Sequence, residues 1–433
     1  MEKAKVLILG SGGREHVFAW KLAEDLSKDS LFVATGNAGT AEIATNVDIG
    51  INDFEAIGDF CVQNEITMVL PGSEDPLVNG IADYFGSRAD LQKIFVMGPS
   101  KLGATLEGSK DFAKEFMQRH DIPTARFQTF TGEDLDAAYE FLDSLEAPYV
   151  LKADGLAAGK GVLILDNVEH AKIELTDMLL NSKFGAASQK VVIEEYLHGI
   201  EFSVFVMTDG DNYIVLPEAK DYKRIGEGDT GLNTGGMGSI SPVPFVDSKL
   251  RKRVEKEIIK PTVKGLKKDN IDYKGFIFIG LMNVDGAPKV IEYNVRMGDP
   301  ETEVVFPRIN NSLLEMMSKA RDKRLNSVKF NLNPQYCTTV FMVSGGYPEA
   351  YDKGKAIEFG ETPDSILFHA GTKISEHRIV TNGGRVIAVS SFGDSMRDAL
   401  NKSYRSIEQI NFEKATWRND IGLDLEAYLG STK

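Results

Sequence analysis

Residues 6–16 read Val-Leu-Ile-Leu-Gly-Ser-Gly-Gly-Arg-Glu-His, an apolar run that passes directly into a glycine-rich turn. Four apolar residues in succession, Val6–Leu9, are typical of a strand that is covered on both faces. Glycines at 10, 12 and 13 let the backbone turn tightly, and apolar residues at helical spacing follow in Glu15–Leu26. This stretch therefore predicts the first strand–turn–helix unit of a parallel α/β sheet.

The same alternation continues through the first hundred residues. Further strands are predicted at Leu31–Ala34, Thr67–Leu70 and Ile94–Met97, and helices at Phe54–Asn64 and Pro76–Phe85. Strands that alternate with helices in this way favour a parallel sheet with right-handed crossovers.

The middle of the chain has a different texture, with more strands joined by glycine-containing turns. The predicted strands are Tyr149–Lys152, Val162–Leu165, Val191–Glu194, Phe202–Thr208, Tyr213–Leu216, Gly275–Met282 and Lys289–Asn294, and the predicted helices are Ser109–His120, Val168–Leu180 and Lys249–Lys268. Between them, Asp221–Pro244 is rich in Gly, Thr and Ser without apolar periodicity, so we expect a long, mobile loop there.

A third unit of mixed α+β type is predicted after Leu325. Its predicted strands are Tyr336–Val343, Ile357–Phe359, Leu367–Ala370 and Val386–Ser391, and a helix is predicted at Ser395–Ile407.

The overall composition excludes several functional classes. The chain has 433 residues, 42% of them hydrophobic and 26% charged, with a formal net charge of −15. That length predicts two to four globular domains, and the acidic balance argues against nonspecific binding to nucleic acid or to anionic membranes. Cys61 and Cys337 suit neither a disulfide framework nor a zinc site, and no apolar run is long enough for a signal segment or a membrane span. We therefore expect a cytoplasmic protein.

The glycine-rich turn at Gly10–His16 is the first candidate binding site. Backbone N–H groups at a helix N-terminus can face an anion, but Glu15 stands where a dinucleotide fingerprint requires glycine. The second strand also ends in Ala34-Thr35-Gly36, with no acidic residue for a ribose. Two interpretations stay open: a turn that only closes the strand–helix joint, and a site for a smaller phosphorylated ligand with Arg14 as an extra donor.

A second glycine-rich segment, Lys152-Ala-Asp-Gly-Leu-Ala-Ala-Gly-Lys-Gly161, lies between two predicted strands. It superficially resembles a P-loop but fails the pattern, because Gly155 and Lys160 are one residue too close and Gly161 replaces the Ser or Thr that would bind magnesium. The segment is either an exposed flexible hairpin or a hairpin that folds over a polyphosphate, offering N–H groups and two ammonium groups.

Acidic residues mark the end of the strand predicted at Val191–Glu194. After Ile193, the segment Glu194-Glu195-Tyr196-Leu197 leaves the sheet and exposes backbone groups that can pair with an adenine edge, while Glu201 can accept ribose hydroxyls. By itself this pattern indicates only a strand end with acidic residues, and a structural role is the more frequent one.

The stretch 290–302 reads Val-Ile-Glu-Tyr-Asn-Val-Arg-Met-Gly-Asp-Pro-Glu-Thr. Strand alternation puts Glu292, Asn294 and Arg296 on one face. Carboxylate and amide oxygens suit a magnesium ion that also binds phosphates, and an arginine beside them can stabilise a transferring phosphoryl group. A solvated sheet face is the alternative, but Gly-Asp-Pro-Glu immediately afterwards favours a metal–phosphate site.

These last three constellations together resemble the ATP-grasp superfamily, whose ligases form acyl phosphates and couple them to amines or thiols. With further motifs the chain resembles, over nearly its whole length and in the right order, the phosphoribosylamine–glycine ligase family. Those motifs are Gly10–His16, Gly36–Thr40, Leu106–Lys110, Asn233–Gly238, Gly298–Thr302, His369–Lys373 and Asn382–Val386.

The resemblance implies an N-terminal parallel α/β (pre-ATP-grasp) domain at 1–104, an ATP-grasp core at 105–327 with a lid subdomain at about 124–194, and a C-terminal α+β domain at 328–433. It implies ATP-dependent ligation of glycine to 5-phosphoribosylamine through glycyl phosphate, giving glycinamide ribonucleotide, ADP and phosphate in purine biosynthesis. The cofactors implied are ATP and Mg²⁺ or Mn²⁺. We expect a monomer that acts on these small molecules, without a nucleic-acid or membrane partner.

The resemblance also implies roles for individual residues. Catalysis is assigned to Arg296, Lys152 and Asp299, and metal binding to Glu292 and Asn294. ATP binding is assigned to Lys110, Lys152, Gly155, Gly159, Lys160, Gly161, Glu194, Glu195, Tyr196, Leu197 and Glu201. Substrate binding is assigned to Gly10, Gly12, Gly13, Arg14, Glu15, Glu74, Asp221 and Arg296.

Two departures from the family pattern stand out. Gly280 occupies the position on the preceding strand where related enzymes often place a second acidic metal ligand, and Pro71–Pro76 differs around Glu74. Three alternatives stay open: another ATP-grasp ligase such as a carboxylase, a nucleotide-binding regulatory protein that has lost catalysis, and a dehydrogenase, which rests on the first glycine motif alone.

Overall fold

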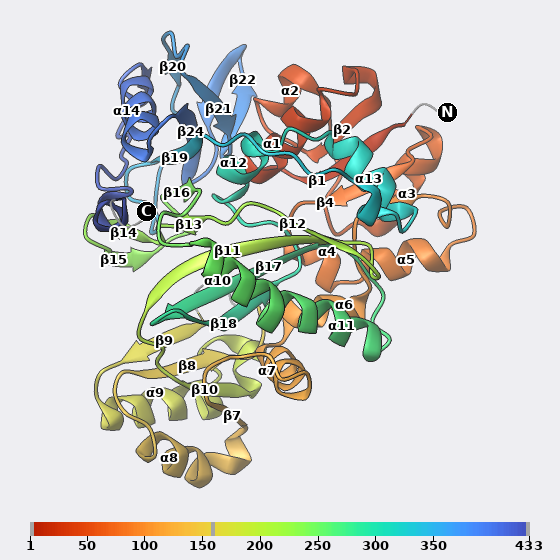
Figure 1. Cartoon of the computed structure of the whole chain (residues 1–433). Helices are drawn as coiled ribbons and strands as arrows, with labels where there is room; N and C mark the ends of the chain where they lie inside the picture. Colours follow the sequence, from red (N-terminus) through yellow and green to blue (C-terminus); the bar gives the residue numbers. More distant parts are fainter. Residues whose placement is uncertain (1–3, 157–160, 430–433) are drawn as a thin grey trace.

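The computed structural model describes residues 4–156 and 161–429, and it contains a parallel sheet, a small antiparallel sheet and two larger antiparallel sheets (Figure 1). The predicted fold class, mixed α/β and α+β in several units, is confirmed.

The N-terminal sheet is fully parallel, with the strand order β3-β2-β1-β4-β5. Its strands are β1 (Val6–Gly10), β2 (Leu31–Thr35), β3 (Thr45–Val47), β4 (Met68–Pro71) and β5 (Phe95–Val96). All five residues of the central β1 are buried, as a strand covered on both faces requires. The four predicted strands are confirmed, whereas β3 was missed because its three residues contain no apolar run.

Five helices accompany this sheet: α1 (Gly13–Leu22), α2 (Thr40–Ile43), α3 (Phe54–Gln63), α4 (Glu74–Val78) and α5 (Ile81–Ser87). The single helix predicted at Pro76–Phe85 is wrong. Gly80, with a φ of 92°, adopts a left-handed conformation that ends one helix and begins the next.

A four-stranded antiparallel sheet with the order β7-β10-β8-β9 forms the smallest unit, at the bottom of Figure 1. Its strands are β7 (Phe127–Phe130), β8 (Tyr149–Ala153), β9 (Val162–Leu165) and β10 (Val191–Glu195), and its helices are α8 (Leu135–Asp143) and α9 (Val168–Asn181). These elements enclose a hydrophobic core of their own, which includes Leu151, Leu175 and Ile193. A separate core lets this unit move as a body.

The central sheet has the order β12-β11-β17-β18, with β6 (Gly98–Pro99) pairing to β17. Its strands are β11 (Ile200–Thr208), β12 (Tyr213–Val215), β17 (Tyr273–Val284) and β18 (Ala287–Asn294). The helical stretch predicted at 249–268 is confirmed as α10 (Ser248–Val254), a π-helical turn (Glu255–Ile259) and α11 (Lys260–Lys268). Helices α6 (Lys101–Gly108) and α7 (Lys110–Arg119) precede the strands of the four-stranded sheet β7-β10-β8-β9, which we refer to as the lid sheet.

The C-terminal sheet has the order β13-β16-β19-β24-β21 and packs against α14 (Met396–Ile407). Its later strands, β19 (Tyr336–Val343), β21 (Ser365–His369) and β24 (Arg385–Gly393), lie close to the predictions. Two earlier strands, β13 (Lys220–Asp221) and β16 (Gly238–Ser241), come from the middle of the chain and join the same sheet through β19.

The long loop predicted at Asp221–Pro244 is therefore wrong as a description of this segment. It contains the hairpin β14 (Arg224–Gly226) and β15 (Thr230–Asn233) and the fully buried strand β16. Gly-Ser-Ile-Ser has almost no hydrophobic signature, and its hydrogen-bond partner is β19, about a hundred residues away. Local periodicity carries no information about such a partner.

The remaining described elements are α12 (Thr302–Val305), α13 (Leu313–Arg321), β20 (Glu358–Phe359), β22 (Thr372–Ser375), β23 (Arg378–Thr381) and β25 (Ile410–Asn411), with several short 3₁₀ turns. None of the helices in the described ranges combines the length and the apolar character that a membrane crossing needs.

Candidate active site

The lid sheet meets the central sheet through a buried cluster of one carboxylate and two lysines. Glu194 on β10 lies 2.8 Å from Lys114 Nζ and 2.9 Å from Lys152 Nζ, and all three side chains are at least nine-tenths buried. Lys152 Nζ also donates to the carbonyl of Ile291 on β18, at 3.3 Å. The cluster therefore connects lid strands to the strand that carries the predicted metal ligands.

Electrostatics keep the carboxylate of this cluster ionised. Burial opposes the charge on Glu194, but Lys114 and Lys152 outweigh it and hold the pKa of Glu194 below its ordinary value. Burial lowers the pKa of Lys114 to about 8, against the opposing effect of Glu194. Sequence analysis missed Lys114, although its neighbours Ala113, Phe116 and Met117 also lie on the buried face of α7. A charged residue among apolar ones on a helix face was the available signal.

The chain leaves the sheet after Glu195, so Glu194 and Glu195 still belong to the strand and only Tyr196 and Leu197 lie beyond it. Glu195 ends β10, and its Oε1 accepts from the backbone N–H of Arg126 at 3.0 Å and from Lys289 Nζ at 3.3 Å. Tyr196 and Leu197 then follow outside any strand. This connection joins β10 of the four-stranded sheet to β11 of the central sheet.

The second glycine-rich segment begins with a well-defined turn. Asp154 Oδ1 accepts from Ser109 Oγ at 2.9 Å and from the N–H of Asp111 at 2.8 Å, while its carbonyl accepts from the N–H of Lys110 at 3.2 Å. Gly155 and Gly161 are described, but the predicted residues Gly159 and Lys160 between them fall outside the described residues. The turn holds the start of α7, and with it Lys110, against the end of β8.

Glu292 and Asn294 lie on one face of β18, and Gly280 on β17 is paired with Glu292. Burial raises the pKa of Glu292, but Lys223, Lys152 and Lys110 outweigh burial and hold it below its ordinary value. No lysine or arginine of the described ranges forms an ion pair with this carboxylate. An ionised carboxylate without a direct partner, beside an amide oxygen, fits a divalent cation whose other ligands are phosphate oxygens.

Arg296 is the centre of a second charged cluster. Its guanidinium lies 2.9 Å from Glu107 Oε1 and 3.2 Å from Glu74 Oε2, and it donates to Asn294 Oδ1 at 3.0 Å. Burial raises the pKa of Glu107 to about 7, in spite of Arg296, and its Oε2 accepts from the N–H of Val295 at 2.8 Å. Glu107, another residue that sequence analysis missed, thus orients the arginine beside the predicted metal ligands.

The N-terminal glycine turn surrounds a carboxylate of the chain itself. Glu15 Oε2 accepts from the N–H of Gly12 at 2.6 Å, and Glu15 Oε1 lies 2.8 Å from Arg14 Nε. A Cβ at Gly10 or at Gly72 would lie within 2.5 Å of the Glu15 side chain. Arg14 is only 8% exposed and also donates to the carbonyl of Met297 at 3.0 Å. The expected free anion donors, Gly12 N–H and Arg14, are therefore already engaged.

A third cluster follows β13. Lys223 Nζ forms an ion pair with Glu201, and burial together with Glu201 raises the pKa of Asp221 although Lys223 lowers it. Asp221, Glu201 and Glu292 outweigh burial and raise the pKa of Lys223 well above its ordinary value. Lys223 was missed because it stands in the segment that was predicted to be a loop. The cluster therefore adds a third lysine to Lys110 and Lys152, whose charges also act on Glu292.

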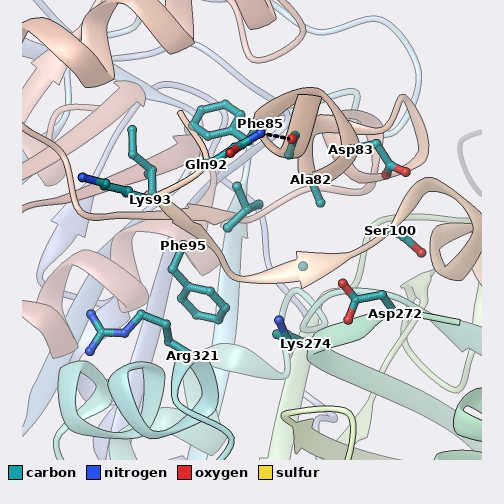
Figure 2. A pocket seen from close by; sticks show the side chains of 14 residues that line it. Ala82, Asp83, Phe85, Gln92, Lys93, Phe95, Ser100, Asp272, Lys274 and Arg321 are labelled. Carbon is teal, nitrogen blue, oxygen red and sulfur yellow. Dashed lines mark hydrogen bonds between the residues drawn. The ribbon is translucent and has the colours of Figure 1, made fainter. Parts of the chain in front are cut away.

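The positions of two cavities can be compared with those of these clusters. The larger, about 420 Å³, lies between α5, β5 and the start of β17, and Phe95, Lys274, Asp272 and Ser100 point into or line it (Figure 2). It contains none of the predicted site residues. The smaller, about 320 Å³, lies beside Gly12 and Asp299. The predicted site residues therefore lie outside the lining of the larger cavity.

A small four-stranded antiparallel sheet beside a larger antiparallel sheet, with Lys152 on a strand of the first and Glu292 and Asn294 on a strand of the second, is the architecture of an ATP-grasp protein. Three family models match the chain: the phosphoribosylglycinamide synthetase N domain at 4–107, its ATP-grasp (A) domain at 108–302 and its C domain at 337–424. The chain belongs to the phosphoribosylglycinamide synthetase family.

Individual relatives agree with the family models. A phosphoribosylamine–glycine ligase of Vibrio vulnificus is 44% identical over 423 residues, covering 96% of this chain and 97% of that protein. The bifunctional purine biosynthetic protein PUR2,5 of Pichia angusta is 44% identical over 429 residues, but this chain spans only 54% of it.

Solved structures extend the comparison. The phosphoribosylamine–glycine ligase of Thermotoga maritima superposes with a TM-score of 0.83 at 35% identity, covering 96% of this chain and all of that one. A biotin carboxylase of Campylobacter jejuni shares the fold, with a TM-score of 0.73 at 15% identity over 99% of this chain and 94% of that one.

Proposed function

We propose that this protein ligates glycine to 5-phosphoribosylamine with ATP as the energy source, forming glycinamide ribonucleotide, ADP and phosphate in purine biosynthesis. The observation that carries the proposal is the convergence of Lys152 from the lid and Glu292, Asn294 and Arg296 from the core, in a chain of the phosphoribosylglycinamide synthetase family. A carboxylate is a poor acylating agent, and a phosphorylated carboxylate is a good one, so we propose glycyl phosphate as the intermediate.

We propose that Glu292 and Asn294 hold a divalent cation, Mg²⁺ or Mn²⁺. Such an ion, when bound, neutralises charge on the β- and γ-phosphates. Gly280 opposite Glu292 offers no side-chain ligand, and no cluster of three or more His, Cys, Asp or Glu side chains suited to a metal is found in the described part of the chain. Further ligands would therefore come from the nucleotide.

We assign different cationic side chains to the two anions that react, which are ATP and the carboxylate that accepts its phosphoryl group. We assign Lys110 and Lys152, on the lid side of Glu292, to the phosphates of ATP. Arg296, held by Glu107 and Glu74, is assigned to the charge that develops on the transferred phosphoryl group, as a preoriented donor. Lys223, whose charge also acts on Glu292, is assigned to the carboxylate that accepts the phosphoryl group.

The other site residues keep the assignments expected from the resemblance. We propose that the lid segment with Gly155, Gly159, Lys160 and Gly161 closes over ATP and excludes water from the acyl phosphate. We assign Glu194, Glu195, Tyr196 and Leu197 to the adenine side of the nucleotide site, with Glu194 acting through Lys114 and Lys152. Glu201 is assigned to the ribose of ATP.

On the acceptor side, we assign Glu74 and Asp221 to the substrate amines and Asp299 to catalysis. Gly10, Gly12, Gly13, Arg14 and Glu15 form the wall of the phosphoribosylamine site. Because Glu15 occupies the N–H of Gly12, we propose that this turn shapes the wall and does not itself bind the phosphate.

We further propose that the protein is a cytoplasmic monomer, with divisions after residues 104 and 327 and a lid at about 124–194. Strand β16 belongs to the middle unit by sequence and to the C-terminal sheet by pairing, so the two units would move together.

An assay of ADP formation tests the proposal. The purified protein is incubated with ATP and a divalent cation, and glycine or phosphoribosylamine is omitted in turn. We expect full turnover only when both are present. Turnover that does not depend on phosphoribosylamine, or that requires a different acid in place of glycine, would contradict the proposal.

A further inference from the structure

The C-terminal segment 418–424 contacts a hairpin that belongs by sequence to the middle of the chain, β14 with β15 (Figure 1). This hairpin is a sheet of only two strands, and its register is interrupted between Arg224 and Gly226. All four residues of β15 are exposed. Because a two-stranded hairpin is marginally stable by itself, its position has to be held by contacts from elsewhere in the protein.

Arg418 supplies such contacts from a buried position. It is only 2% exposed, and its Nη1 donates to the carbonyl of Arg224 at 3.1 Å and to Asp229 Oδ1 at 2.7 Å. Its Nε and Nη2 donate to the two carboxylate oxygens of Asp420, both at 2.7 Å. Asp420 Oδ2 also accepts from the N–H of Gly228 at 2.7 Å. Arg418 and Asp420 together therefore hold the start and the turn of the hairpin at three points.

Tyr222, two residues before the hairpin, is enclosed by the same C-terminal segment. Its ring centre lies 5.3 Å from the guanidinium carbon of Arg418, and its hydroxyl donates to Asp424 Oδ1 at 2.6 Å. Lys220 Nζ lies 3.8 Å from the centre of the same ring and 3.1 Å from Asp424 Oδ2. The side chains of Lys220 and Tyr222 are both buried, and both contact the C-terminal segment.

Lys223, the next residue, belongs to the opposite face of the same stretch of chain. Tyr222 continues the pairing of β13 with β16, since its N–H donates to the carbonyl of Gly238 at 3.0 Å, and successive side chains of an extended chain point to opposite sides. Lys223 forms an ion pair with Glu201, and the charge of Glu292 also acts on it. One short stretch of chain therefore contacts C-terminal residues on one face and the surroundings of the proposed metal site on the other.

Two hydrogen-bonded carbonyls fix the backbone at Lys223. The carbonyl of Lys223 accepts from the N–H and the Oγ1 of Thr234, at 2.7 and 2.8 Å. The next carbonyl, that of Arg224, accepts from Arg418. The ammonium group of a lysine ends a flexible four-carbon stem, so its mean position depends on how firmly the backbone below it is held. Arg418 gives the C-terminal unit a direct hold on that backbone.

We propose that Arg418 is the positioning residue of Lys223: it fixes the start of β14 and thereby keeps the Lys223 ammonium group beside Glu201 and Glu292 during the reaction. The inference rests on the proposed function, in which Lys223 is assigned to the carboxylate that accepts the phosphoryl group, and makes it more specific. Arg418 acts only through Lys223. Since a displacement of about 1 Å in a reacting group can cost about a hundredfold in rate, the loss of this hold should be measurable in kcat.

A double-mutant cycle of Arg418→Met and Lys223→Met tests the inference, with kcat measured as ADP formation at saturating ATP, glycine and phosphoribosylamine. In otherwise wild-type protein we expect Arg418→Met to lower kcat at least about tenfold. In the Lys223→Met background the same change should lower kcat less than about twofold, because the residue through which Arg418 acts is already absent. Arg418→Lys keeps the charge without the forked donors and should recover part of the loss. Arg405→Met, on the surface of the same unit where Arg405 pairs with Asp364, is the matched control and should keep the wild-type kcat.

The outcomes separate this inference from the proposed function. Wild-type protein that forms no ADP with all three substrates would contradict the proposed function and the inference with it. With an active wild type, an Arg418→Met effect that is equally large with and without Lys223, or a kcat that does not change, would overturn the inference alone. Thermal unfolding shows whether each variant is folded. If Arg418→Met is not, Asp229→Asn replaces it in the cycle, since it weakens the hold of Arg418 from the exposed turn; its loss, about threefold, should likewise disappear in the Lys223→Met background.

Discussion

Two carboxylates of the proposed nucleotide site, Glu194 on β10 and Glu292 on β18, lie among lysines and yet have opposite surroundings. Glu194 is 3% exposed and is paired with Lys114 and Lys152 at 2.8 and 2.9 Å. Glu292 is half-buried, and the surrounding cations reach it only at longer range. A carboxylate whose charge is already matched holds the structure together, whereas one whose charge is matched only by distant cations can still bind a metal ion.

Glu107 is an intermediate case that makes the comparison sharper. It is buried with one cation, Arg296, and one backbone donor, and its pKa is raised to about 7. The three carboxylates thus form a series in which the number of direct cationic partners is two, one and none. The four predictions below test that series.

The largest effect is expected for Glu194→Ala, measured as the free energy of unfolding in urea. Removing the carboxylate leaves two buried lysines without their partner, which typically costs about 3–5 kcal/mol. Glu195→Ala is the matched control next in sequence, because its ion pair with Lys289 is partly exposed and such pairs contribute less than about 1 kcal/mol. Equal losses in the two variants would remove the distinction between a structural and an exposed carboxylate.

Arg296→Ala should reduce kcat far more than it weakens ATP binding. If Arg296 acts on the transition state, the loss of one preoriented donor costs on the order of 3 kcal/mol, or about a hundredfold in kcat. Steady-state kinetics with titration of an ATP analogue separates the two effects. A kcat close to that of the wild type would exclude Arg296 from the chemical step.

Glu292→Gln should weaken divalent-metal binding by at least about a hundredfold while changing the unfolding free energy by less than about 1 kcal/mol. The amide keeps the shape of the side chain and removes its charge. Mn²⁺ binding followed by electron paramagnetic resonance, in the presence of an ATP analogue, measures the first quantity directly. A variant that lost stability as Glu194→Ala does, and kept its metal affinity, would reverse the roles of the two carboxylates.

Glu107 should make stability depend on pH. Because its pKa in the folded protein, about 7, is higher than the ordinary value of 4.5, folding favours its protonated form. Its stabilising contribution is complete below about pH 4.5 and is lost as the pH rises through 7. We expect the unfolding free energy of the wild type, relative to Glu107→Gln, to fall by about 2 kcal/mol between pH 5 and 8. A difference that is constant over this range would show that Arg296 keeps Glu107 ionised.

Much of the fold could be predicted from local pattern. The apolar runs at Val6–Leu9 and Tyr336–Val343 are strands, and Ser109 caps α7 by accepting from the N–H of Phe112 at 3.1 Å. The single helix predicted at Pro76–Phe85 failed at Gly80, because glycine permits either a continued helix or a left-handed break and its neighbours in sequence do not decide between them.

The candidate site, like the fold, could be predicted only where it depends on local sequence pattern. Strand alternation placed Glu292, Asn294 and Arg296 together, and the structure brings Asn294 and Arg296 into hydrogen-bond contact. Lys114, Glu107 and Lys223 were missed, because the role of each depends on a contact with a residue at least 22 positions away in the sequence. The anion site expected at Gly12 was predicted from helix geometry, but its ligand proved to be Glu15, three residues later.

The amino-acid sequence by itself determined the strands and helices, the glycine turns and the line of oxygen and guanidinium groups on β18, since each depends on neighbours within a few residues. Only the tertiary structure decided which charges are neutralised and which are left for ligands. Glu194 meets Lys114 across 80 residues and Asp299 meets Arg385 across 86, and contacts at that separation depend on how whole sheets pack. Burial then sets the free energy of each charge, and burial is a property of the folded chain.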